Sequence, residues 1–170
     1  MRMGAAAAIA MIAAFVVAAC GDDTVDADKV EVGIEQDLSS ATTKIVSVSC
    51  PDDVEQKKGE KFTCDAKLEG GGKAEVEVTL TNDRGDATYA FKPGSVEVSG
   101  NAVESQLEKS LEASGVSGVQ VSCPDLIKVA DGQTATCNAQ GSGGRTGEIT
   151  FTWSDDAGDI DSSSVEARGS

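Results

Sequence analysis

The sequence predicts an α+β fold made of two tandem modules, each with one N-terminal helix packed on a four-stranded antiparallel sheet and one intramodule disulfide. Three observations predict it. The segment Val-Ser-Cys-Pro-Asp at 48–52 returns at 121–125. The rest of the module repeats with the same offset and without a gap, and we call this offset the repeat distance. Within each copy, an apolar period of four gives way to an apolar period of two, which is typical of a helix followed by strands. Each copy also carries two cysteines at matching positions.

Residues 1–19 have the pattern of a secretory signal peptide. Arg2 supplies a positive charge, and an uninterrupted apolar run follows from Ala5 to Ala19. This run is shorter than the roughly 20 residues that a membrane-spanning helix needs. We therefore expect export and cleavage rather than a permanent transmembrane helix.

Cys20 follows two alanines at the end of this run, in a pattern that resembles the bacterial lipobox. In a lipobox the cysteine thiol receives a diacylglyceryl group, and signal peptidase II cuts before it. Lipidation would also account for an odd number of cysteines, five, in an exported chain. The alternative is ordinary cleavage nearby, with Cys20 left as a free thiol. Residues 20–28 are then expected to form the lipidated cysteine and a short acidic tether.

The other four cysteines are expected to pair, because exported proteins meet an oxidising compartment. Of the three possible pairings, only Cys50–Cys64 with Cys123–Cys137 respects the duplication. Each bond would close a loop of about 15 residues, for which the chain-entropy estimate is about 3 kcal/mol. A zinc site is the alternative, but the chain has no histidine and no C-x₂-C knuckle.

Module 1 is expected at residues 29–91. Its helix carries one apolar stripe, and polar positions between the stripe residues, such as Glu31, are expected in water. Alternation of apolar and polar residues then predicts three half-buried strands, and a turn at 82–85 leads into a fourth at 86–91. The stripe contains Val30, Ile34 and Leu38, and the inward positions of the strands are Val46, Val48 and Cys50, then Phe62, Cys64, Ala66 and Leu68, then Ala74, Val76, Val78 and Leu80.

Module 2 is expected at 101–165, after a linker at 92–100 and before a tail at 166–170. Val96 and Val98 in the linker could extend the last strand of module 1. The last strand of module 2 is expected from 159 to about 165. The helix stripe is Val103, Leu107 and Leu111, with Glu104 in water, and the inward strand positions are Val119, Val121 and Cys123, then Ala135, Cys137 and Ala139, then Ile149, Phe151 and Trp153.

The cysteines of each module fall on inward-facing positions of the strands. We therefore expect each disulfide on the inner face of its sheet, beneath the helix. Module 2 has alanines and glycines at several inward positions where module 1 has larger side chains. We expect Phe151 and Trp153 to fill the space that these leave. The alternative for Trp153 is that it stacks on a ligand.

The chain has a formal net charge of −15, and its basic residues are scattered among about twice as many acids. No nucleic-acid partner is expected, because a phosphate backbone requires clusters of Lys and Arg. Anionic lipid headgroups are disfavoured for the same reason, so the expected membrane contact is the diacylglyceryl group on Cys20. The acidic surface is expected to keep the protein soluble; the alternative is a cationic partner.

These features together resemble a known family. A lipobox cysteine, an acidic tether, an amphipathic helix, V-x-C-P, a glycine eight residues after the proline, T-C and a Gly-bearing hairpin resemble the domain of unknown function 4333, found in actinobacterial lipoproteins and secreted proteins. Both copies match, at Val48 to Cys64 and at Val121 to Cys137. The resemblance implies a small extracytoplasmic α+β module with an intramodule disulfide and no established activity, and it carries no catalytic residues to transfer.

No catalytic residue, metal site or cofactor is expected, and the ligand-binding residues stay unassigned. General acid–base work most often uses histidine, which is missing, and no Ser–Lys or carboxylate pair stands out. Acidic residues at the turns lack the spacing of a calcium loop; they are Asp83 and Asp86 in module 1, and Asp155, Asp156 and Asp159 in module 2.

The expected function is therefore that of an extracytoplasmic lipid-anchored binding or scaffold protein, with an envelope protein or ligand as its partner. The alternative is an inhibitor or regulatory subunit of an extracytoplasmic enzyme. An inhibitor should present one concave surface across both modules with protruding aromatic anchors.

Overall fold

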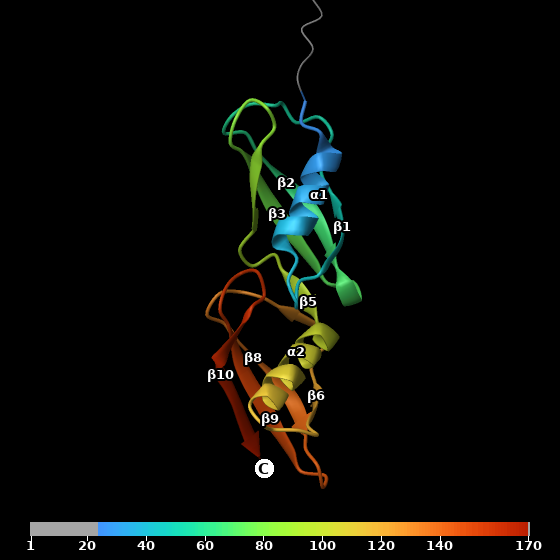
Figure 1. The fold of residues 1–170 in the computed structure, drawn as a ribbon, viewed down its shortest axis with the longest axis vertical. Coiled ribbons are helices and arrows are strands. Elements are labelled where there is room, and N and C mark those ends of the chain that lie inside the picture. The colour runs from blue at the N-terminus through green and yellow to red at the C-terminus, as the bar shows by residue number, and fades with distance from the viewer. Residues whose placement is uncertain (1–23, 170) are drawn as a thin grey trace, which may run out of the picture.

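The computed structural model describes residues 24–169. Two modules are stacked end to end along the long axis of the molecule (Figure 1). The chain enters at the end of module 1 that is farthest from module 2. The expected signal peptide at 1–19 and the expected lipidation site Cys20 lie outside the described residues. Within residues 24–169, no helix combines the length and the apolar character needed to cross a membrane.

Each module has one helix, and the two helices begin in the same way. Helix α1 spans Ala27–Leu38 and helix α2 spans Gly100–Ala113. Asp26 caps α1 by accepting a hydrogen bond from a backbone N–H of the first turn, and Ser99, at the equivalent position of the second copy, does the same for α2. The predicted stripes are confirmed, since their first two members are fully buried in each module: Val30 and Ile34, and Val103 and Leu107.

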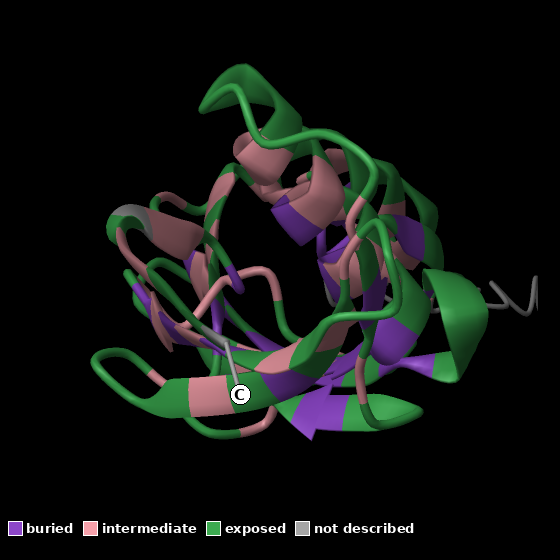
Figure 2. Ribbon diagram, turned by 90° about the horizontal axis from the view of Figure 1, so that it is seen from below, coloured by how far each residue is buried: buried purple, intermediate pink, exposed green. Residues whose placement is uncertain are grey.

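The predicted strands of module 1 are confirmed. They form an antiparallel sheet in the order β1-β2-β3-β4, beneath α1, and buried and exposed positions alternate along β2 and β3. Figure 2 shows how buried, intermediate and exposed residues alternate along the ribbon of the molecule. One inward position was wrong: Val46 is exposed, because the pairing register shifts between Ile45 and Ser47 and turns Ile45 inward. The strands are β1 (Ile45–Ser49), β2 (Lys61–Leu68), β3 (Lys73–Leu80) and β4 (Ala87–Phe91), with a 3₁₀ turn at Glu69–Gly71.

Module 2 repeats the pattern with four antiparallel strands in the order β10-β9-β8-β6. The last strand continues further than the sequence predicted. Its final residues pair with β9, so 166–169, expected as a tail, belong to the sheet. The strands are β6 (Gln120–Ser122), β8 (Thr134–Gln140), β9 (Thr146–Trp153) and β10 (Ile160–Gly169).

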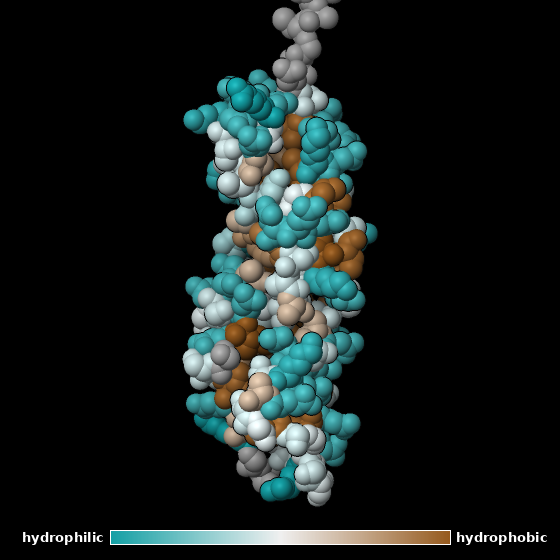
Figure 3. Space-filling model, viewed as in Figure 1, coloured by the Kyte–Doolittle hydropathy of each residue, from teal (hydrophilic) through white to brown (hydrophobic). Residues whose placement is uncertain are grey.

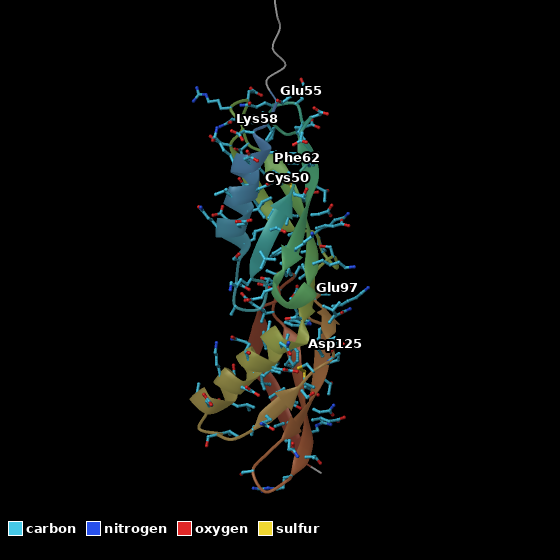
Figure 4. All side chains as sticks on the ribbon, turned by 90° about the vertical axis from the view of Figure 1, so that its right-hand side faces the viewer. Cys50, Glu55, Lys58, Phe62, Glu97 and Asp125 are labelled. Carbon is cyan, nitrogen blue, oxygen red and sulfur yellow. A yellow bond between two sulfur atoms is a disulfide. The ribbon has the colours of Figure 1, made fainter. Side chains whose placement is uncertain are left out.

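The two modules are joined by two short strands. The sequence indicated that Val96 and Val98 could extend the last strand of module 1, but this segment instead forms a separate strand that bridges the modules. β5 (Glu97–Ser99) lies inside the expected linker and pairs with β3 at one residue, Lys73 opposite Glu97. Its other edge pairs over its whole length with β7 (Leu126–Lys128), which belongs to module 2. The sheet of module 1 therefore continues into module 2, and Figure 4 shows Glu97 and Asp125 at this junction.

The same pairing occurs at the start of module 1. Thr24 forms an antiparallel bridge with Glu55, and the N–H of Val25 donates to the carbonyl of Val54 at 2.9 Å. These contacts are the counterparts, at the repeat distance, of the β5–β7 pairs. Val25 is buried at 6% exposure. Residues 24–28 are thus part of the folded module, not of a tether, because the repeat begins one strand upstream of each helix.

The junction depends on close approach between backbones. A Cβ atom at Gly72 would overlap the carbonyl oxygen of Glu97, and one at Gly100 would overlap the carbonyl oxygen of Pro124. The Thr42 hydroxyl also donates to the carbonyl of Gly158, across the two modules. These contacts fix the modules against each other.

Candidate functional site

The predicted disulfides are confirmed. Cys50 bonds to Cys64 and Cys123 bonds to Cys137, with Cα–Cα distances of 4.4 and 4.5 Å. Cys64 and Cys137 are buried under the helix of their module. All four sulfur atoms are consumed by these bonds, so they are not available as zinc ligands.

Helix glutamates hold the strand that carries the first cysteine of each module. Glu31 accepts a hydrogen bond from the N–H of Cys50 at 2.9 Å, and Glu104 accepts one from the N–H of Cys123 at 2.7 Å. The prediction that these two side chains face water was wrong. The reason is that β1 and β6 are edge strands, whose unpaired N–H groups require an acceptor.

The turn aspartates satisfy backbone donors. Asp83 accepts from the N–H of Lys58 at 2.7 Å, and the equivalent Asp156 accepts from the N–H of Asp131 at 3.2 Å. Asp155 accepts from two N–H groups of its own turn. In the part of the chain that the structure describes, no three or more His, Cys, Asp or Glu side chains are grouped to hold a metal ion.

The rings of Phe151 and Trp153 pack edge to face inside module 2. Their centroids lie 5.1 Å apart at an interplanar angle of 88°. Trp153 is only 1% exposed. A packing role is therefore observed for both rings, and Trp153 has no exposed face for a ligand to stack on.

A hollow of about 580 Å³ lies in module 2, where α2, β6, β8 and the start of β9 meet. We call it the neutral groove, because most of its polar side chains are uncharged amides and hydroxyls. Glu108 is the only charged residue in the lining, and its carboxylate already accepts from the N–H of Val121 at 3.1 Å. The lining is Glu108, Gln120, Val121, Ser122, Asn138, Ala139, Gln140, Thr146 and Gly147.

Module 1 has a hollow of about 460 Å³ over the equivalent ends of its second and third strands, but its other wall is formed by Glu75, Ser95 and Glu97 instead of residues of the helix and first strand. Asp65, Lys67 and Lys73 stand where module 2 has Asn138, Gln140 and Thr146. Three of its charged side chains form ion pairs: Lys73 lies 3.2 Å from Glu97 within the lining, and Glu75 lies 2.6 Å from Lys92 outside it. The two hollows therefore share their strand ends, and module 2 has uncharged side chains there in place of charged ones.

Amides and hydroxyls offer both donors and acceptors without a fixed charge. Such a lining can bind neutral polar groups, such as peptide bonds or sugar hydroxyls, without the cost of desolvating an ion. Threonines continue this uncharged surface along the sheet, where the hydroxyls of Thr136 and Thr150 lie 3.3 Å apart. The sequence contains a sign of this surface, because every second residue of 134–140 is polar and uncharged, in the pattern Thr-x-Thr-x-Asn-x-Gln. This pattern does not show by itself that the side chains border a hollow.

Comparison with known proteins gives one match. A family model described as Domain of unknown function (DUF4333) matches residues 10–85 and 87–158. No curated protein and no solved structure matches the chain. The two matched segments agree with the duplication and with the two modules of the structure.

Proposed function

We propose that this chain, which belongs to the DUF4333 family and contains two tandem copies of its domain, is an extracytoplasmic lipid-anchored binding or scaffold protein. The observation that carries the proposal is the neutral groove of module 2. It is a recess of about 580 Å³ lined mostly by uncharged donors and acceptors, whereas the hollow over the matching strand ends of module 1 carries ion-paired charges.

Two features support a location outside the cytoplasm. Disulfides persist mainly in oxidising compartments, and both modules contain one. The apolar run and the cysteine at position 20 have the pattern of a lipoprotein signal. We propose that a diacylglyceryl group on Cys20 supplies the membrane contact, because a chain with a net charge of −15 gains no attraction from anionic lipids.

The arrangement of the modules fits this role. The described chain begins at one end of the long axis, and the β8–β9 hairpin of module 2 lies at the other end (Figure 1). An anchor at Cys20 would place module 1 next to the membrane, as a spacer. The neutral groove of module 2 would then face outward, toward an envelope protein or ligand.

The observations favour this function over inhibition of an enzyme. An inhibitor would need protruding aromatic anchors. In residues 24–169 every aromatic ring is buried or half-buried, and the face in Figure 3 is mostly hydrophilic with small hydrophobic patches. The aromatic residues concerned are Phe62, Tyr89, Phe91, Phe151 and Trp153.

A charge swap between the two hollows tests the groove. The double variant Asn138→Asp with Gln140→Lys gives module 2 the charges of module 1 at two lining positions, and Asp65→Asn with Lys67→Gln is the matched control. All four side chains are exposed, so we expect both variants to fold. Each lipidated protein is used for affinity capture from intact envelopes.

The proposal expects a partner that the native chain and the module 1 control retain, and that the module 2 variant loses. Equal capture by all three proteins would refute the groove as the binding surface. A separate arm tests the anchor: Cys20→Ser should move the protein from the membrane fraction to the soluble fraction, and mass spectrometry of the native protein should detect the diacylglyceryl group.

A further inference from the structure

The core of module 2 is open at the end that faces away from module 1. Four inward positions that hold buried apolar side chains in module 1 are glycines at the equivalent positions of module 2. Ile45, Leu68, Ala74 and Val96 are all at most 8% exposed, and their counterparts are Gly118, Gly141, Gly147 and Gly169. The helix and sheet are retained, so the lost side chains leave space between them.

A cavity of about 180 Å³ occupies this region, between the end of α2 and the ends of β8, β9 and β10. Its wall is apolar and contains Leu111, Val119 and Ile149, and the half-exposed Val116 lies at its edge. An enclosed apolar cavity of about 150 Å³ holds a benzene molecule, and this one, which is open to solvent, has a similar volume, with room for roughly six carbon atoms. It borders the neutral groove at Ala139, Thr146 and Gly147, but its chemistry is different.

The rim of the cavity is cationic, although the chain as a whole is strongly acidic. Arg145 and Arg168, two of the four arginines in the sequence, line it together with one acid, Glu148. Arg145 has no ion-pair partner within residues 24–169. Arg168 makes only a long, exposed contact of 3.5 Å with Glu166, and exposed pairs of this kind are weak. Both guanidinium groups can therefore turn toward an incoming anion.

An apolar cavity edged by two arginines that can turn their guanidinium groups toward it is complementary to a molecule with a hydrocarbon chain and an anionic head. We infer that module 2 binds a free fatty acid of medium length, with the alkyl chain in the place that Leu68 and its neighbours fill in module 1, and with the carboxylate between Arg145 and Arg168. Bidentate pairing of guanidinium with carboxylate fixes the head group. This inference does not depend on the neutral groove or on its partner.

Calorimetric titration of the full chain carrying Cys20→Ser tests the inference, because no acyl group of the protein itself then competes. The ligands are butanoate, hexanoate, octanoate and decanoate, with octanol as the uncharged analogue. Burial of each methylene should raise the affinity about fourfold until the cavity is full near six carbons, after which the gain should stop. NMR shifts caused by octanoate should be confined to module 2, since module 1 has its cavity filled.

Two variants test the binding of the ligand's alkyl chain and of its carboxylate separately. Gly141→Leu supplies the side chain of Leu68, and a Cβ atom there meets nothing closer than the Arg145 carbonyl oxygen at 3.8 Å. We expect it to weaken octanoate at least tenfold, whereas Ser142→Leu, next to it on the exposed hairpin, should have no effect. Arg145→Gln should lower the affinity for octanoate severalfold and leave the affinity for octanol unchanged.

Several results would overturn the inference. One is the absence of saturable octanoate binding, and another is octanoate affinity that survives Gly141→Leu in a folded protein. If Gly141→Leu does not fold, NMR shifts of the native chain that fall outside the cavity lining would refute it. Binding to phosphatidylglycerol vesicles without binding to free octanoate would show a lipid surface as the ligand instead.

Discussion

Gly72→Ala should weaken the junction between the modules through a purely steric effect. The backbone of Gly72 has φ −65° and ψ 167°, which an alanine adopts without strain. A Cβ atom there, however, would overlap the carbonyl oxygen of Glu97 and lie 3.3 Å from the Cα of Val98. Both are backbone atoms of β5, so neither can rotate away, and β5 has to move from the edge of β3.

The size of the effect follows from two opposing contributions. Overpacking of this kind costs about 1–3 kcal/mol. Replacing glycine by alanine in an allowed conformation gains roughly 0.5 kcal/mol by restricting the unfolded chain. We therefore expect the free energy of unfolding to fall by about 0.5–2.5 kcal/mol.

Urea denaturation of the full chain carrying Cys20→Ser measures this change, with circular dichroism as the probe. Small-angle scattering should show a broader distribution of module orientations in Gly72→Ala. Arg145 occupies the equivalent position in module 2, where no further strand docks within the described residues, so Arg145→Ala is the matched control. A stability within about 0.5 kcal/mol of the parent, with an unchanged scattering profile, would refute the steric argument.

Replacing Cys123 and Cys137 together by alanine should lower the free energy of unfolding by about 3 kcal/mol, measured by urea denaturation; a loss below about 1 kcal/mol would contradict the loop-entropy reasoning. Glu104→Ala should cost about 1–3 kcal/mol, because it leaves the N–H of Cys123 without its acceptor, whereas Glu104→Gln should retain most of the stability; equal losses would point to another cause. Burial, and secondarily the charges of Asp37 and Asp86, raises the pKa of Tyr89 above its ordinary value near 10. Its contribution to stability is thus complete below about pH 10 and is lost as the pH rises through the folded-state pKa. Absorbance at about 295 nm reports this only tyrosine of the chain, and an unshifted titration would contradict its burial.

The sequence predicted what depends on local periodicity and on the repeat. The stripe of Val30 and Ile34, the alternation along 74–80 and the two disulfides all follow from side chains a few residues apart or at the repeat distance. Val96 and Val98 were expected as a possible extension of the last strand of module 1, but the pairing of β5 was not predicted, because its partners lie in two different modules. β7 was missed because it has only three residues. The bulge after Ile45 was missed because a register shift leaves no mark in a pattern read from one strand.

The candidate sites were harder to predict. The outward residues of β8 read as an ordinary solvated face, and only the position of α2 and β6 beside them makes a groove. The glycines of module 2 were expected to be compensated by Phe151 and Trp153. Both rings are buried, but the cavity at the far end stays open, because it borders Ile149, Gly147 and Gly141 instead.

The shared position of β5 decides how the protein can be divided. A cut in 92–100 separates β5 from one of its two partners. If β5 stays with module 1, the β7 segment loses its only strand neighbour among the described residues. If β5 stays with module 2, the start of β3 is left uncovered. Exposed strand edges of this kind recruit other chains and promote aggregation. Each half expressed alone is therefore expected to self-associate unless the fragment of module 2 begins before Val96 and that of module 1 retains residues through Ser99.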